Sequence, residues 1–152
     1  MKKTLIVRIA EGLGNQLFMY ANAYSLSKKF GYSLYIDDES GFSKNKRSRS
    51  YNLDFFNIPE QLCPEQLKFN NFIKNFKRKS YKFIDNFISN KKFIIEKVDE
   101  NKQTKFEEIS KLCSIQMFIE GHYESELYFK DYEKDLKKIL KIKYDLIDKN
   151  NS

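Results

Sequence analysis

The chain has 152 residues, of which 41% are hydrophobic and 16% aromatic, so it can bury the core of one domain but is short for two. Its formal net charge of +7 makes nucleic acid and anionic surfaces the charged partners to consider first. Cys63 and Cys113 are isolated thiols and His122 is the single histidine, which excludes the usual zinc clusters. We therefore expect no metal and no bound cofactor.

The first expected element is an apolar strand that leads through a glycine turn into a helix. Residues 4–10 are a nearly continuous apolar run, the pattern of a strand buried on both faces. Gly12 and Gly14 follow, and both permit a positive φ angle and a close approach to the backbone. Apolar residues then recur at helical spacing over residues 16–30, until Gly31 ends the helix. The turn either needs glycine for geometry alone or presents free N–H groups to an anion such as phosphate.

A second strand is expected over residues 33–37, and it ends at the acidic pair Asp37 and Asp38. In an open α/β sheet, ligands collect at the carboxyl ends of the strands. Asp37 either caps the following turn or contacts a sugar hydroxyl, and the frequency of Asp in turns favours the cap. The basic loop over residues 39–50 then leads to an aromatic segment that begins at Tyr51.

The middle of the chain is predicted to hold two short helices, over residues 65–75 and 81–88, and a short strand over residues 93–95. Most of the excess positive charge lies between residues 74 and 105. Aromatic residues interleaved with it suit either base stacking or the buried face of a helix: Phe76, Tyr81, Phe83 and Phe87. No recognised nucleic-acid motif accompanies them. We therefore favour a buried aromatic face beside solvated lysines, and we expect no nucleic-acid partner.

The last expected elements are a strand over residues 114–120, a turn at Gly121 and a helix over residues 125–140. The polar tail at residues 145–152 is expected to fray. Strands that alternate with helices predict an α/β fold with a mainly parallel sheet and flanking helices, and with the first strand in its interior. Residues 1–144 are expected to form this single domain, in which the two glycine turns meet at one edge of the sheet.

The N-terminal apolar run is too short for export or for a membrane span. Arg8 and Glu11 interrupt it before it reaches the length of a signal peptide core or a transmembrane helix. We therefore expect a cytoplasmic protein. Its basic surface is expected to permit peripheral association with the inner face of the membrane.

Three stretches of the sequence carry a resemblance to a known family. The first is Gly-Leu-Gly-Asn-Gln-Leu-Phe-Met-Tyr-Ala at residues 12–21, directly after the first strand. The second is Arg-Ser-Tyr-Asn-Leu at residues 49–53, with Phe56 downstream, and the third is Gly-His-Tyr-Glu-Ser-Glu-Leu-Tyr-Phe at residues 121–129. In this order they resemble the motifs of glycosyltransferase family 11, the α-1,2-fucosyltransferases, whose third motif is Gly-Tyr-Trp-Gln-Ser-Glu-Lys-Tyr-Phe.

The resemblance implies a function in surface polysaccharide biosynthesis. The family's members are metal-independent, inverting enzymes of the GT-B type that move fucose from GDP-fucose to the 2-hydroxyl of an acceptor galactose. This chain resembles their Rossmann-like N-terminal half. The family's donor signature, His-x-Arg-x-x-Asp, occurs nowhere in the 152 residues, so we expect the C-terminal donor-binding domain to be absent and the truncated chain to be inactive alone. The alternatives are an inactive remnant and a basic interaction module without catalysis.

The matched motifs supply the candidate site residues. By the resemblance, the glycine turn lies at the cleft beside the donor phosphates, with Gly12, Gly14, Asn15 and Gln16. The candidate residues on the acceptor side are Asp37, Arg49, Tyr51, His122, Tyr123 and Glu126. Glu11 departs from the family pattern, because it replaces a usual glycine and adds negative charge beside the expected diphosphate.

Two of the acceptor-side candidates also have a structural interpretation, which we favour. Glu126 suits a first-turn carboxylate that stabilises its own helix through the helix dipole. His122 suits an ordinary turn residue, since the sequence identifies no carboxylate partner for its ring. No catalytic residue is assigned from the sequence.

Overall fold

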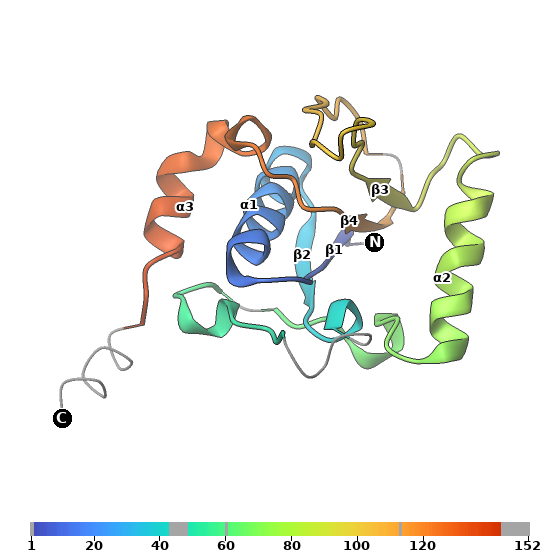
Figure 1. Cartoon of the computed structure of the whole chain (residues 1–152), viewed down its shortest axis with the longest axis horizontal. Coiled ribbons are helices and arrows are strands. Elements are labelled where there is room, and N and C mark those ends of the chain that lie inside the picture. The colour runs from blue at the N-terminus through green and yellow to red at the C-terminus, as the bar shows by residue number, and fades with distance from the viewer. Residues whose placement is uncertain (1, 43–48, 60, 113, 144–152) are drawn as a thin grey trace.

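The computed structural model describes residues 2–42, 49–59, 61–112 and 114–143, and it shows a parallel sheet with helices on both faces (Figure 1). The strands are β1 (Thr4–Arg8), β2 (Ser33–Asp37), β3 (Phe93–Ile95) and β4 (Gln116–Glu120). They lie in the order β2-β1-β4-β3, and every pairing is parallel. The α/β class, the parallel sheet and the interior position of the first strand are therefore confirmed, and the arrangement is compatible with a Rossmann-like fold.

Helix α1 (Leu13–Phe30) covers one face of the sheet and forms the larger core with it. Tyr20, Ala21 and Leu26 are buried there against strand residues such as Leu5. The helix begins one turn earlier than the predicted residue 16. It ends as predicted, because Gly31 adopts the left-handed conformation at φ 69° and its N–H bonds to the carbonyl of Ser27.

Helix α2 (Phe72–Ile84) lies beside the other face of the sheet and replaces the two helices predicted for the middle of the chain. Asn71 caps its first turn, since the Asn71 side chain accepts a hydrogen bond of 2.8 Å from the N–H of Lys74. Residues 65–67 form only a single 3₁₀ turn. The prediction was wrong because no glycine or proline interrupts residues 72–84, so one helix runs through the gap we had placed there.

The predicted burial of the aromatic residues on α2 and in the turn after it is also wrong. Phe76, Phe83 and Phe87 are 68%, 65% and 75% exposed, and of the four aromatic residues we singled out, Tyr81 alone packs against the smaller core on this face. The helix meets the sheet through its charged side instead. Arg78 Nε and Lys82 Nζ each lie 2.5 Å from a carboxylate oxygen of Glu120, at the end of β4. A buried carboxylate needs such cations, and this requirement fixes which side of α2 faces inward.

The predicted helix over residues 125–140 is broken into two 3₁₀ turns, Glu126–Tyr128 and Lys130–Tyr132, and a short helix α3 (Glu133–Ile139). Phe129 interrupts the helical backbone at φ −136°. Its ring lies 6.0 Å from that of Phe18, whereas the ring of the preceding Tyr128 lies 5.0 Å from that of Tyr123. These two ring contacts stabilise the broken conformation of the segment, and a continuous helix does not form there.

Some predictions fall partly or wholly outside the described residues. These are the fraying of the tail at residues 145–152, most of the basic loop over residues 39–50, and the environment of Cys113. Cys63 is described and buried, and burial raises the pKa of its thiol to about 12. None of the helices in the described part of the chain combines the length and the apolarity that a bilayer crossing requires.

Candidate functional site

The first turn of α1 stands beyond the carboxyl end of β1 and is open to ligands. Gly12 precedes the helix in an extended conformation, no side chain caps the turn, and its first turn contains no acidic residue. A Cβ atom placed on Gly12 or Gly14 would meet nothing within 4 Å. The space beside the two glycines is therefore open, and it lies next to the positive end of the helix dipole, which favours an anion.

We expected a positive φ angle at Gly12 or Gly14. In the structure it is Glu11 that adopts one, at 66°, and neither glycine does. A residue with a side chain is strained in this conformation by about 1 kcal/mol or more. An ion pair with Arg49 of the second motif holds the Glu11 carboxylate. The residue that departs from the family pattern is thus the one that adopts the conformation glycine would favour.

Gln16 joins the first motif to the second. Its side chain is fully buried, and its Nε2 donates hydrogen bonds of 2.9 Å to the carbonyl of Glu11 and 2.8 Å to that of Ser50. Its Oε1 accepts one of 2.9 Å from the N–H of Asn52. These bonds occupy the carboxamide, so Gln16 positions the loop. The carboxamide of Asn15 is partly exposed and bonds to none of the described residues, which leaves it available to a ligand.

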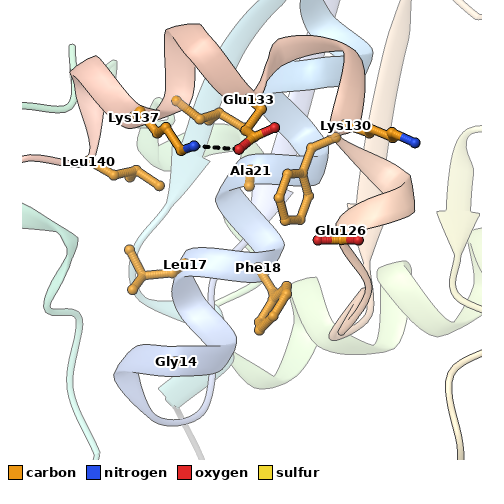
Figure 2. A pocket seen from close by; sticks show the side chains of 11 residues that line it. Gly14, Leu17, Phe18, Ala21, Glu126, Lys130, Glu133, Lys137 and Leu140 are labelled. Atoms are coloured by element: carbon orange, nitrogen blue, oxygen red, sulfur yellow. Dashed lines mark ion pairs between the residues drawn. The ribbon is translucent and has the colours of Figure 1, made fainter.

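A groove of about 610 Å³ separates α1 from the third motif and α3 (Figure 2). Gly14, Leu17 and Phe18 line it from α1. Glu126 and Phe129 line it from the third motif. The two glycine turns follow the adjacent parallel strands β1 and β4 and so lie at the same edge of the sheet, as predicted, although Gly121 is not among the residues that line the groove. Most of the groove wall is apolar.

Glu126 contributes a carboxylate to this groove that bonds to none of the described residues. The turn that it begins is a 3₁₀ turn of three residues, which is too short to develop a helix dipole. The stabilising role that we favoured from the sequence therefore has little basis in this fold. The other carboxylate of the groove, that of Glu133, pairs at 2.5 Å with Lys137.

A second, polar hollow of about 400 Å³ lies beyond the carboxyl end of β2. Arg49 and Tyr51 of the second motif line it, together with Asp38, Glu39 and Asn70 among others. From the sequence we expected Arg49 and Tyr51 at this site but not Asp38 and Glu39. The available signal was the acidic run that follows a strand, at the end of the sheet where ligands collect.

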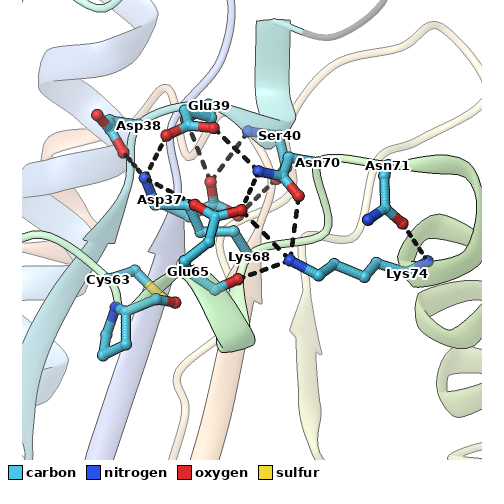
Figure 3. A network of polar contacts seen from close by, with 11 residues as sticks. Asp37, Asp38, Glu39, Ser40, Cys63, Glu65, Lys68, Asn70, Asn71 and Lys74 are labelled. Atoms are coloured by element: carbon cyan, nitrogen blue, oxygen red, sulfur yellow. Dashed lines mark hydrogen bonds and ion pairs between the residues drawn. The ribbon is translucent and has the colours of Figure 1, made fainter.

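Lys68 holds the two carboxylates of this hollow in place (Figure 3). Its Nζ lies 2.8 Å from Asp38 Oδ1 and 2.5 Å from Glu39 Oε1, and its side chain is 8% exposed. Burial lowers the pKa of this ammonium group, but the hydrogen bonds and charges of Asp38 and Glu39 outweigh burial and raise the pKa above its ordinary value. Lys68 therefore stays charged at physiological pH and fixes the acidic rim.

Asp37 acts as a turn cap, the role that the sequence favoured. It is 1% exposed, and its Oδ1 accepts hydrogen bonds from the N–H groups of Glu39 and Ser40 at 3.2 and 2.9 Å. Its Oδ2 accepts one of 2.5 Å from the hydroxyl of Ser40. These bonds and its burial leave Asp37 unable to reach a sugar in this structure.

Of the two remaining candidates, Tyr123 lies in the core and His122 lies at the surface. Tyr123 is 2% exposed, and its hydroxyl donates to the carbonyl of Glu120 at 3.1 Å. Burial raises the pKa of its phenol well above the ordinary value. The Nδ1 of His122 lies 3.8 Å from Glu124 Oε1, so the ring has a neighbouring carboxylate that the sequence did not identify. That distance is too long for a hydrogen bond.

Comparison of the chain with protein-family models, with curated proteins and with solved structures gave no match. Among the described residues, no group of three His, Cys, Asp or Glu side chains is placed to hold a metal ion.

Proposed function

We propose that this chain is the acceptor-side lobe of a sugar-transfer enzyme of the kind it resembles, one that moves fucose from GDP-fucose to the 2-hydroxyl of a galactose-containing acceptor. One observation carries the proposal: the three motifs are far apart in the sequence and adjacent in the fold. Gln16 joins the first motif to Ser50 and Asn52, and Phe18 joins it to Phe129 of the third. Turns kept for local geometry alone would not need to come together at the carboxyl edge of one sheet.

In this proposal the donor diphosphate lies over the first turn of α1. The open N–H groups beside Gly12 and Gly14 and the carboxamide of Asn15 would bind phosphate oxygens. A departing diphosphate also needs cations in a site that excludes water. The family supplies them from its His-x-Arg-x-x-Asp strand, which this sequence lacks. We therefore expect the 152-residue chain to bind ligands but not to turn over GDP-fucose by itself.

The acceptor sugar would enter the polar hollow beside Arg49 and Tyr51. Carboxylates held by Lys68 accept hydrogen bonds from sugar hydroxyls, and the guanidinium of Arg49 donates them. The rim is fixed before the sugar arrives, so binding costs little ordering of side chains. This makes the hollow better suited to a sugar than the largely apolar groove.

The reaction also needs a base. In an inverting transfer, the acceptor oxygen bonds to C1 of fucose while the bond from C1 to the phosphate oxygen breaks; the hydroxyl proton passes to the base, and GDP leaves with the electron pair. Glu126 is the carboxylate of the groove that has no partner among the described residues. A base must lie within hydrogen-bond reach of the acceptor hydroxyl, and Glu126 lines the groove rather than the polar hollow, so no base is assigned.

The test is to titrate the purified chain with methyl galactoside and, separately, with GDP, and to follow binding by NMR. We expect Arg49→Ala to weaken galactoside binding by about tenfold or more, because it removes charge-assisted hydrogen bonds. Asn15→Ala should weaken GDP binding and leave galactoside binding unchanged. Lys91→Ala is the matched control, because Lys91 is exposed and lines neither the groove nor the polar hollow. It should change neither galactoside binding nor GDP binding.

A transfer assay then separates the alternatives. Fucosylated galactoside above the level without enzyme would show that our expectation about the missing donor strand is wrong. In that case Asn15→Ala should reduce the rate strongly. Binding of ligands without transfer agrees with a lobe that needs its donor-binding partner. A folded chain that binds neither galactoside nor GDP would leave the interaction module as the better account.

A further inference from the structure

The outward face of α2 is an apolar stripe that nothing in the described structure covers. It consists of Phe72, Ile73, Phe76, Phe83 and Ile84 on the helix and of Phe87 in the turn directly after it, and we call these residues the outer stripe. Phe72 is 88% exposed and Ile73 is 78% exposed. Monomeric proteins rarely expose a continuous apolar surface of this kind unless it binds something.

The inward side of α2 explains why the stripe cannot turn toward the sheet. Arg78 and Lys82 both pair with the carboxylate of Glu120, which is only 8% exposed. Asp85, just after the helix, accepts hydrogen bonds from the N–H groups of Lys92 and Phe93 at the start of β3. Rotating the helix would leave the buried carboxylate of Glu120 without its two cations, which is strongly unfavourable. The orientation is therefore fixed, and the stripe faces outward in the folded chain.

The edges of the stripe are basic. Lys77 lies one helical turn from Ile73, and Lys79 lies within one turn of both Phe76 and Phe83; both lysines are exposed. The helix has no acidic residue over Phe72–Ile84. Two copies of this face brought together would therefore oppose lysine to lysine with no carboxylate on either helix to pair with them. A surface that is apolar inside and negatively charged at its edge complements the stripe.

We propose that α2 binds the surface of an anionic lipid bilayer, with the outer stripe at the acyl boundary and Lys77 and Lys79 at the headgroup phosphates. The 13-residue helix is about 20 Å long, so it can lie in the plane of the interface. Aromatic residues on one side and lysines beside them are the composition of interfacial helices. This inference does not depend on the sugar-transfer proposal, since α1 and its glycine turn lie across the sheet from α2 (Figure 1).

A fluorescent reporter gives a direct test, because the chain contains no tryptophan. Phe83→Trp places a single reporter in the outer stripe, and Phe55→Trp places a matched reporter at a half-exposed position elsewhere. With vesicles of phosphatidylcholine and phosphatidylglycerol, we expect the emission of the first reporter to shift to the blue as it leaves water. The emission of the second should not move. Pure phosphatidylcholine vesicles should produce a much smaller shift.

Co-sedimentation with the same vesicles tests the residues themselves. Phe76→Ser combined with Phe83→Ser should reduce binding by tenfold or more, since two aromatic rings no longer leave water. Lys77→Gln and Lys79→Gln should each weaken binding about fivefold, and added salt should weaken it further. Ile115→Ser and Lys134→Gln, at exposed positions elsewhere, are the matched controls and should have little effect.

Three results would overturn the proposal. The first is vesicle binding that is absent, or equal for neutral and anionic lipid, in a chain that circular dichroism shows to be folded. The second is a concentration-dependent dimer that Phe76→Ser and Phe83→Ser abolish, which would assign the stripe to a second copy. The third is tight, salt-sensitive binding of RNA or DNA that the same variants weaken, which would assign it to nucleic acid.

Discussion

Helices α1 and α2 pack on the same sheet in opposite ways. Helix α1 buries aromatic and apolar residues such as Tyr20 and Leu26 and is enclosed around most of its circumference. Helix α2 segregates its apolar and charged residues more sharply, yet it turns Arg78 and Lys82 toward the sheet and its phenylalanines away from it. The separation of apolar and charged residues on two sides of a helix therefore shows that one side contacts an apolar environment. It does not show which of the two sides packs against the sheet of the same domain.

The largest effect expected from this contrast is a difference between two matched substitutions. Leu26→Ala in α1 removes a side chain that is 5% exposed and should lower the free energy of unfolding by about 3 kcal/mol. Ile73→Ala in α2 should change it by less than about 0.5 kcal/mol, because the side chain is already exposed and alanine favours the helix. Urea unfolding of both variants measures the difference. Equal losses would mean that α2 is buried in solution.

A second substitution removes the anchor of α2. Glu120→Gln leaves the cations of Arg78 and Lys82 without their carboxylate, and we expect a loss of about 2 kcal/mol because those cations are themselves partly exposed. Hydrogen exchange of the amides of α2 should also accelerate more than that of α1. The control is Glu107→Gln in the exposed pair with Lys97, which should cost less than about 0.5 kcal/mol. Unchanged exchange in α2 would contradict the anchoring role.

Acid should weaken the attachment of α2 before that of α1. Burial raises the pKa of Glu120, but hydrogen bonds from Arg78 and Lys82 outweigh it, and the net pKa lies below the ordinary value of 4.5. A lowered pKa in the folded state gives stability that is complete above 4.5 and is lost as the pH falls through the folded value. Stability measured from neutral pH downward should therefore fall less steeply in Glu120→Gln than in the parent chain. Parallel curves would contradict this assignment.

The smallest effect concerns the turn before α1. Glu11→Gly relieves a left-handed residue at φ 66° but removes the ion pair with Arg49 and loosens the unfolded chain. Strain relief of about 1 kcal/mol or more should exceed the loss of a half-exposed pair, for a net gain of about 0.5 kcal/mol. Glu11→Ala removes the same pair without relieving the strain, so it should be less stable than Glu11→Gly. Thermal unfolding of the two variants gives the sign.

The sequence predicted the site in outline and missed its details. Motif order indicated which segments matter, and strand ends indicated where they meet. The sequence did not indicate that Gln16 would be buried between two loops, because a carboxamide bonds equally well to backbone or ligand. It also did not indicate that Asp38 and Glu39, rather than Asp37, would line the polar hollow. Those assignments depend on distant partners such as Lys68.

By itself the sequence determined the parallel α/β sheet, the central strand β1 and the end of α1 at Gly31, since local patterns of apolar residues and glycine specify these features. Only the tertiary structure decided which side of α2 faces inward and where the segment after β4 becomes helical. The first was decided by the carboxylate of Glu120, and the second by ring contacts of Tyr128 and Phe129. Both depend on groups brought together from distant parts of the chain, and periodicity within one segment contains no information about them.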